Sequence, residues 1–369
     1  MTGPFAGKRV LLISPAFVAD RRHKRVHGVE LFNFLFVRRL VEMGVRVTLA
    51  AEPRWKAGFE EHLAGVGDGL DVIYGMPLKR PLAVSLSLVP KMVKHGPYDL
   101  VVLGNNGRGI LPAVKLLQRF GKRKSPCMLF AHQYANAKYL KQLRAVDLSV
   151  HCVSEAVAAD FRAQNRWPVS VGYGILNGEK FFPRDVSGGG ADGSRPLRFG
   201  VVGKLDTPWK GAHLAIEAWE KLPASVRGGG GKAELHMLAY STPPAKLPAG
   251  VVLHDWLPLE KIPEFMRTLD VLIVPSTSAE SFSQVSVQGM LTGLPLLVYP
   301  IPVLTEKIDA GGGAAFSTPT ELAGLVERCV LEPTWCTAMG VAARRTALER
   351  YCWSAEGFCE RFLGSGGSK

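Results

Sequence analysis

The residues best suited to chemistry stand in one short segment that ends a predicted strand and opens a predicted helix. The strand is the apolar run 271–274, and the polar residues after it are Glu280, Ser281, Phe282, Ser283 and Gln288. A helix start offers unpaired backbone N–H groups and a partial positive charge, which suit a phosphate. The Glu280 carboxylate and the Gln288 amide can hydrogen-bond hydroxyl groups. Phosphate, sugar and ribose are the parts of a nucleotide-sugar, so the segment predicts a site for one.

A second group of residues supplies cations. Gly203 and Lys204 end a predicted strand over 197–202, and Lys210 precedes a predicted helix over 212–220. A nucleotide diphosphate gains negative charge as its bond to a sugar breaks, and fixed cations stabilise that charge. These motifs contain no Asp-x-Asp or histidine pattern for a divalent ion, so no metal is predicted and the two lysines take its place.

Three more candidates follow predicted strands. Gly28 stands between the first strand and its helix, where a backbone without Cβ lets a ligand come close. His132 follows the strand 127–130, and Trp256 follows the strand 251–253. Each also has a purely structural explanation: a helix-start glycine, a loop histidine and a packed indole.

The motifs together resemble those of retaining glycosyltransferases of family 4, which have the GT-B fold. The family signature is Glu-Gly-Phe-Gly, four residues, then Glu-Ala-Met. Glu280 and Phe282 match it, whereas Ser281 and Ser283 replace the glycines and Gln288 replaces the second glutamate. Lys204 replaces an arginine of the family's Gly-Arg-Leu, and His27-Gly28-Val29-Glu30 resembles its Gly-Gly-Val-Glu.

The resemblance implies a metal-independent hexosyltransferase that moves a sugar, with retention, from a nucleotide-sugar to a glycan or lipid-linked acceptor. It implies a donor that is a UDP-sugar, slightly preferred over a GDP-sugar, and it implies no bound cofactor. Catalytic roles fall to Glu280, His132 and Lys210. Donor binding falls to Gly28, Gly203, Lys204, Lys210, Trp256, Ser281, Phe282, Ser283 and Gln288. The family's usual reaction is front-face attack, in which the donor phosphate itself accepts the proton of the acceptor.

The order of elements predicts an α/β protein with two Rossmann-like domains facing a central cleft. Apolar runs alternate with amphipathic stretches twice, which indicates two parallel sheets covered by helices. The glycine-rich stretch 187–195 separates them. We therefore expect an N-terminal acceptor-binding domain over 1–185 and a C-terminal donor-binding domain over 186–350. A last helix within 351–369 is expected to pack back on the first domain.

Composition and charge narrow the alternatives. The 369 residues predict two domains, and no apolar run reaches the length of a membrane span. The stretch 8–19 could be a short signal peptide or a first strand, and the strand is favoured because a helix with a nucleotide-type turn follows it. The six cysteines form no Cys-x2-Cys pair, so a metal site is not expected. Scattered cysteines also fit a reducing, cytoplasmic location.

The excess of positive over negative charge lies entirely in the first half of the chain. Residues 1–185 hold 28 lysines and arginines against 14 acidic residues, whereas the remainder holds 17 against 18. Such a surface attracts anionic membranes or acidic ligands. No nucleic-acid motif is present. We expect a peripheral contact with the inner face of a membrane; the alternatives are an acidic polysaccharide acceptor that uses the same residues and a solvated face with no partner. The likeliest contacts are Arg21, Arg22, Lys24 and Arg25.

Two rival functions remain open at this stage. The substitutions at 204, 281, 283 and 288 would also fit a non-catalytic relative that keeps the fold as a binding or scaffolding protein. A dehydrogenase or epimerase is the second rival. A dehydrogenase would need Gly-x-Gly-x-x-Gly after the first strand, and Ser14-Pro15-Ala16-Phe17 does not provide it.

Overall fold

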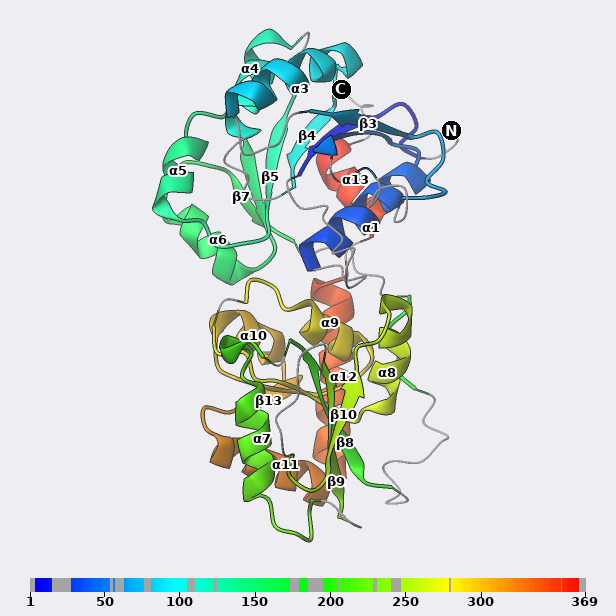
Figure 1. Cartoon of the computed structure of the whole chain (residues 1–369), viewed down its shortest axis with the longest axis vertical. Coiled ribbons are helices and arrows are strands. Elements are labelled where there is room, and N and C mark those ends of the chain that lie inside the picture. Colours follow the sequence, from blue (N-terminus) through cyan, green and yellow to red (C-terminus); the bar gives the residue numbers. More distant parts are fainter. Residues whose placement is uncertain are drawn as a thin grey trace. The chain divides into compact units, whose positions relative to one another are not determined.

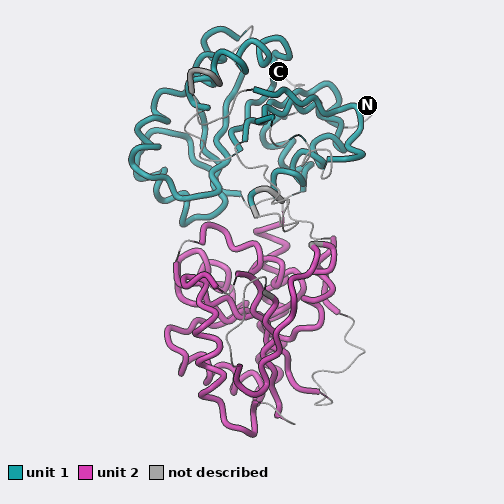
Figure 2. The backbone as a smooth tube through the Cα atoms, viewed as in Figure 1, with its two compact units in different colours: residues 1–176, 353–369 teal, residues 177–352 magenta. Residues whose placement is uncertain are grey.

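The computed structural model describes residues 4–14, 28–53, 56, 63–75, 81–104, 110–121, 125–172, 179–184, 195–204, 206–227, 231–239, 247–278, 280–352 and 354–364. Two compact units make up the chain, Met1–Leu176 with Trp353–Lys369 and Asn177–Cys352 (Figure 2). Each unit has its own parallel sheet with helices on both faces (Figure 1).

The sheet of the first unit has seven parallel strands in the order β3-β2-β1-β4-β5-β6-β7. The strands are β1 Arg9–Ile13, β2 Arg46–Ala51, β3 Leu70–Tyr74, β4 Leu100–Leu103, β5 Cys127–Ala131, β6 Ser149–Cys152 and β7 Val169–Val171. The helices are α1 Gly28–Glu42, α3 Pro81–His95, α4 Leu111–Phe120, α5 Ala137–Leu143 and α6 Glu155–Arg162. Arg9–Ile13 is thus the first strand of a sheet, and its last four residues are buried.

The last helix of the chain, α13 Ala355–Leu363, belongs to this first unit. Its Phe358 ring lies edge-on to Phe36 of α1, with the ring centroids 4.7 Å apart. Phe362, one turn later, lies 5.1 Å from the ring of His151 on β6. The end of the chain therefore completes the hydrophobic core of its first half.

The sheet of the second unit repeats the same order in six strands, β10-β9-β8-β11-β12-β13. They are β8 Leu197–Gly203, β9 Ala233–Ala239, β10 Val251–Asp255, β11 Val271–Val274, β12 Leu296–Val298 and β13 Gly313–Ala315. The helices are α7 Ala212–Lys221, α8 Ile262–Thr268, α9 Gln284–Leu291, α10 Pro302–Ile308, α11 Pro319–Leu331 and α12 Pro333–Arg350. The second unit also has two short 3-10 helices, η3 Pro208–Lys210 and η4 Leu259–Lys261.

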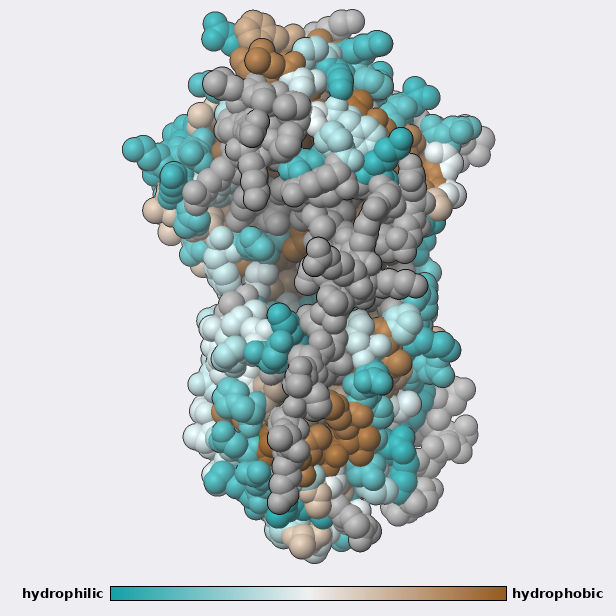
Figure 3. Space-filling model, in the orientation of Figure 1, coloured by the Kyte–Doolittle hydropathy of each residue, from teal (hydrophilic) through white to brown (hydrophobic). Residues whose placement is uncertain are grey.

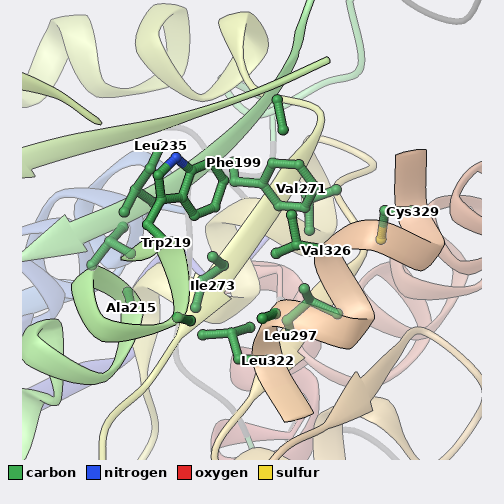
Figure 4. Close-up of a cluster of buried hydrophobic side chains, with 14 of the residues drawn as sticks. Phe199, Ala215, Trp219, Leu235, Val271, Ile273, Leu297, Leu322, Val326 and Cys329 are labelled. Carbon is green, nitrogen blue, oxygen red and sulfur yellow. The ribbon is translucent and has the colours of Figure 1, made fainter. Parts of the chain in front are cut away.

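Helices α7 and α11 cover one face of this sheet over a continuous apolar core (Figure 4). Trp219 of α7 is fully buried and its ring lies 5.6 Å from that of Phe199 on β8. Leu322 and Val326 of α11 are also fully buried in the same cluster. Burial of such side chains contributes about 2 kcal/mol each, which holds the strand ends in place at the opposite edge.

The sequence-based boundary at 185/186 and the division at 176/177 differ for a physical reason. Residues 179–184 pack on the second unit: the Arg267 guanidinium lies 4.4 Å from the Phe182 ring. The Arg184 guanidinium donates to Asp270 at 2.6 Å, and Asp270 is nearly buried. The glycine-rich stretch 187–195 indicated a linker in the sequence, but these contacts attach the segment before it to the second unit.

Candidate functional site

The predicted donor residues meet at the carboxyl edge of the second sheet. Strands β8 and β11 are neighbours. The strands that follow β8 in sequence lie on one side of it, and those that follow β11 lie on the other side. The carboxyl ends of β8 and β11 therefore form the topological switch point of the sheet. Open α/β sheets bind their ligands at this point. Gly203 ends β8 there, and the segment 275–283 follows β11 into α9.

Lys210 and Glu280 form an ion pair at this edge although 70 residues separate them. The Ser276 hydroxyl donates to the same Glu280 oxygen at 2.9 Å. Only 9% of the Glu280 side chain is exposed, against 28% of Lys210. The Lys210 ammonium also lies 4.5 Å from the ring centroid of Trp209. A nearly buried carboxylate is thus held between a cation and a hydroxyl, and the cation is the more accessible partner.

A close backbone approach makes this pair possible. Gly211 adopts a φ of +69°, and a Cβ there would lie 2.0 Å from the carbonyl oxygen of Pro275. Only glycine fits both conditions. The Thr277 N–H donates to the Trp209 carbonyl at 2.8 Å and links the same two loops. The start of α7 therefore lies directly against the end of β11.

Helix α9 begins at Gln284 after Ser283, which has a left-handed backbone with φ 59° and ψ 75°. The Ser283 side chain makes no capping bond to the helix and instead pairs with the Ser286 hydroxyl at 2.7 Å. Gln288 is half-buried one turn into α9. The first turn of an eight-residue helix thus faces this edge next to Glu280, as a phosphate site requires.

The other predicted donor residues fall at the same edge with different exposures. Gly203 has a φ of +148° and no atom within 4 Å of where a Cβ would stand, which leaves open space for a ligand. Lys204 is 47% exposed and lies 3.9 Å from Asp206. Trp256 follows β10 and is half-buried. Ser281 is half-buried in the turn after Glu280.

Phe282 is turned into the unit. It is 8% exposed, and its ring packs 6.3 Å from that of Tyr351 at the end of α12. Its side chain anchors the turn from behind, so the donor contact predicted for this residue is limited to its backbone.

Sequence reasoning missed two residues of this constellation. Ser276 was not singled out, although a hydroxyl four residues before Glu280 could have been noticed. Lys307 of α10 is fully buried behind the turn, with its ammonium 5.1 Å from the Phe282 ring. Its signal was a lysine at helical spacing from the apolar Val303 and Leu304.

His132 lies in the first unit at the carboxyl end of β5. It is 6% exposed, stacked on Phe130 at 4.8 Å and edge-on to Phe32 at 4.7 Å. Burial, aided by neighbouring His151, lowers the pKa of His132 to about 3. Its buried Nε2 has no hydrogen-bond partner among the described residues. A neutral imidazole at this position can exchange a hydrogen bond with a hydroxyl but cannot supply a positive charge at neutral pH.

Several candidates are not placed. Arg21, Arg22, Lys24, Arg25 and His27 lie outside the described residues, and of Gly28 only its position as the first residue of α1 is described. Within the described ranges, no three histidine, cysteine or acidic residues are grouped to hold a metal ion. No described helix is long and apolar enough to cross a bilayer.

The second unit also contains a cavity of about 760 Å³, at the edge of the sheet where the strands begin. It is lined by residues just before β8, β11 and β12, among them Leu269, Asp270 and Pro295, and by Arg344 of α12. Because ligands of open α/β sheets bind beyond the carboxyl ends of the strands, this cavity is not the predicted donor site.

One family model matches part of the chain. Residues 196–331 match the family model Glycosyl transferases group 1. No curated protein matches the chain in sequence. The matched range holds the second sheet and every predicted donor residue except Gly28.

The whole chain is similar in structure to solved glycosyltransferases. HepE of Anabaena in complex with UDP has a TM-score of 0.72 at 17% identity, covering 97% of this chain and 100% of that one. Sucrose-phosphate synthase of Thermosynechococcus elongatus has 0.72 at 16%, covering 96% and 98%. WaaG, a glycosyltransferase involved in lipopolysaccharide biosynthesis, has 0.63 at 16%, covering 97% and 100%. The fold predicted from the sequence, two Rossmann-like α/β domains of the GT-B type, is confirmed.

The buried histidines lead to a prediction about acid stability. His132 and His151 both have a pKa lowered to about 3 by burial, whereas an unfolded histidine titrates near 6.5. The unfolded state therefore binds more protons between these values, and the free energy of unfolding falls as pH drops below 6.5. Between pH 7 and pH 5 each histidine should contribute a loss of about 2 kcal/mol.

His132→Phe keeps an aromatic ring against Phe130 and removes one titrating group. Urea unfolding at pH 7 and 5 should show a pH-dependent loss smaller by about 2 kcal/mol in the variant than in the wild type. Between pH 7.5 and 8.5 both proteins should change in parallel. An equal loss in both proteins down to pH 5 would contradict the assigned burial.

Proposed function

We propose that the protein is a retaining glycosyltransferase that moves a hexose from a nucleotide-sugar, by preference a UDP-sugar, to a glycan or lipid-linked acceptor. The observation that carries the proposal is the Lys210–Glu280 pair beside the start of α9 at the β8/β11 switch point. HepE, which has the same fold, has been solved with UDP and with UDP-glucose. That likeness supports a UDP-sugar as donor.

Each part of a donor has a partner at this edge. The diphosphate would take Lys210, Lys204 and the N–H groups at the start of α9, because all are cationic or carry partial positive charge. The sugar hydroxyls would donate to Glu280, and the ribose would bond Gln288. Because Lys210 and Glu280 are paired with each other, a donor competes for both at once: its anion for the lysine and its hydroxyls for the carboxylate.

The proposed reaction requires no protein nucleophile. The acceptor oxygen forms a bond to the anomeric carbon on the face from which the diphosphate departs, and the leaving phosphate accepts the acceptor proton. Lys210 stabilises the charge that develops on that phosphate. In the proposed reaction Glu280 and neutral His132 would orient hydroxyl groups.

A non-catalytic binding protein is the second candidate. Ser281, Ser283 and Gln288 favour it, because Ser283 holds a left-handed backbone where a glycine would be unstrained. Hydrolysis of a UDP-sugar in solution separates the two functions: a transferase releases UDP slowly in water, whereas a binding protein retains the intact donor.

The donor-site residues can be tested by paired substitutions. Lys210→Ala and Glu280→Ala should each reduce transfer a hundredfold or more, which is roughly 2.7 kcal/mol of transition-state stabilisation. Lys261 and Glu264 form a surface ion pair in the same unit, so Lys261→Ala and Glu264→Ala are matched controls expected to retain full turnover. Folded variants at 210 and 280 with near-full turnover would overturn the assignment.

Metal dependence is a separate prediction. Because Lys204 and Lys210 are proposed to neutralise the diphosphate, transfer should continue unchanged in excess EDTA. Loss of activity in EDTA that Mg²⁺ or Mn²⁺ restores would show that a metal performs this role instead.

We further propose that the basic first unit meets an anionic membrane surface carrying the acceptor. Two large apolar side chains are exposed on it, Leu86 of α3 at 80% and Phe120 of α4 at 61%. Lys91 and Lys94 are exposed on α3, and the Arg119 guanidinium of α4 lies 5.5 Å from the centroid of the Phe120 ring. Apolar side chains are visible where these two helices form the end of the unit (Figure 3). A location at the inner face of the cytoplasmic membrane would suit both features, and the likeness to WaaG supports a lipid-linked acceptor.

Co-sedimentation with liposomes tests this contact. Binding to anionic vesicles should exceed binding to neutral ones and weaken with salt, since each lysine or arginine near such a surface adds about 1 kcal/mol. Replacing Arg21, Arg22, Lys24 and Arg25 by Gln, or Leu86 and Phe120 by Ser, should each reduce it. Negligible binding to both vesicle types at low salt would overturn the membrane contact and leave a soluble acidic acceptor or no partner.

A further inference from the structure

Lys307 is the most deeply buried charged side chain beside the donor turn. Its exposed fraction is 0%, its ammonium donates to the Val303 carbonyl at 2.8 Å, and it lies 3.4 Å from a Glu306 carboxylate oxygen. Burying an ammonium is costly even when it is paired, and well-packed apolar residues in place of both partners are often at least as stable. A charged pair kept at such a cost is a candidate for a functional role.

Two aromatic rings enclose the Lys307 ammonium. Phe282 and Tyr351 each lie with their ring centroid 5.1 Å from Nζ, and the two rings are 6.3 Å apart at 64°. A desolvated cation is attracted to both ring faces. The Tyr351 hydroxyl donates to the Glu306 carbonyl at 3.1 Å, which fixes the second ring to α10. Lys307 thus links the turn before α9 to α10 and to the end of α12.

The turn that Lys307 supports contains a costly backbone conformation. Ser283 has the left-handed backbone of a glycine, a conformation that non-glycine residues adopt at a cost. Phe282 stands directly before it, and Glu280 two residues earlier. A fixed Phe282 ring therefore fixes the direction of the Glu280 carboxylate and of the first N–H groups of α9.

Lys307 also acts on Glu280 through charge. Burial lowers the pKa of Lys307 to about 8, while the carboxylates of Glu306 and Glu280 oppose this change. The group is therefore mainly protonated at neutral pH. Lys307 is thus a second positive charge near Glu280, in addition to Lys210.

We propose that Lys307 is a positioning residue of the donor site: its buried ammonium holds Phe282 between α10 and α12 and thereby fixes the Glu280–Ser283 turn for a nucleotide-sugar. The inference rests on the proposed function, because the turn is the proposed binding site for the sugar and the diphosphate.

Lys307→Met tests the role because it removes the charge and keeps the length. The melting temperature should fall, because the partly buried Glu306 loses its partner, so donor binding is measured on folded protein well below that temperature. The Kd for UDP-glucose and the donor KM should rise about tenfold or more, with a smaller change in kcat, since loss of a desolvated cation–ring contact is about a tenfold to thirtyfold effect. Amide hydrogen exchange over 280–287 should become faster without donor. A purely structural lysine would also lower the melting temperature but would leave the donor KM of the folded protein unchanged.

Two further variants sharpen the test. Phe282→Leu keeps burial and removes the ring face, so its effect on donor Kd should equal that of Lys307→Met and should not add to it in the double variant. Lys307→Arg keeps the cation and should restore part of the affinity. Lys261→Met, an exposed lysine in the same unit, is the matched control and should change nothing.

The outcomes separate this inference from the proposed function. Wild type that binds UDP-glucose, with Lys307→Met binding equally well and exchanging equally slowly, overturns the inference alone. Additive effects of Lys307→Met and Phe282→Leu overturn it as well. Wild type that binds neither UDP nor UDP-glucose overturns the proposed function, and the positioning role with it.

Discussion

The candidate site depends on one close contact between backbones at the centre of the second sheet. Gly211, before α7, lies so near the Pro275 carbonyl after β11 that no side chain fits between them. This approach places Lys210 beside Glu280 without any long loop to carry it. It follows from the order of the sheet, because β8 and β11 are neighbours whose connections leave in opposite directions. Chemistry that needs a cation and a carboxylate together is thus built from two elements that are already rigid.

The same contact sets the electrostatics. Glu280 is nearly buried, and a buried carboxylate is stable only with partners. Lys210 and the Ser276 hydroxyl supply these partners at the exposed side. The buried Lys307 lies behind the turn. In the proposed function a diphosphate would compete with Glu280 for Lys210, and the sugar hydroxyls would then take the place of Lys210 at the carboxylate.

Much of the framework could be predicted from the sequence because the central strands are fully buried. Such strands are short apolar runs with clear ends, and the predicted strands 127–130 and 271–274 match the fully buried β5 and β11 to within one residue. The edge strands β7 and β13 were missed. Each has three residues, and Gly313-Ala314-Ala315 carries no apolar period at all. A strand of this kind forms because a neighbouring edge offers hydrogen bonds, and that information lies in the neighbour.

Side-chain direction was the harder part of the site. Spacing placed Glu280, Gln288 and Lys210 at one sheet edge, but it could not show that Phe282 turns inward to Lys307 and Tyr351, since these contacts join elements that are distant in sequence. The two halves of the chain also differ in how well their motifs could be identified from the sequence. Residues 196–331 match a family model, which is expected if this half binds the diphosphate and ribose that many donors share. The first half instead presents a buried neutral histidine and a basic surface. If that half binds the acceptor, its residues follow the shape and charge of one particular acceptor, and a general motif has less reason to persist there.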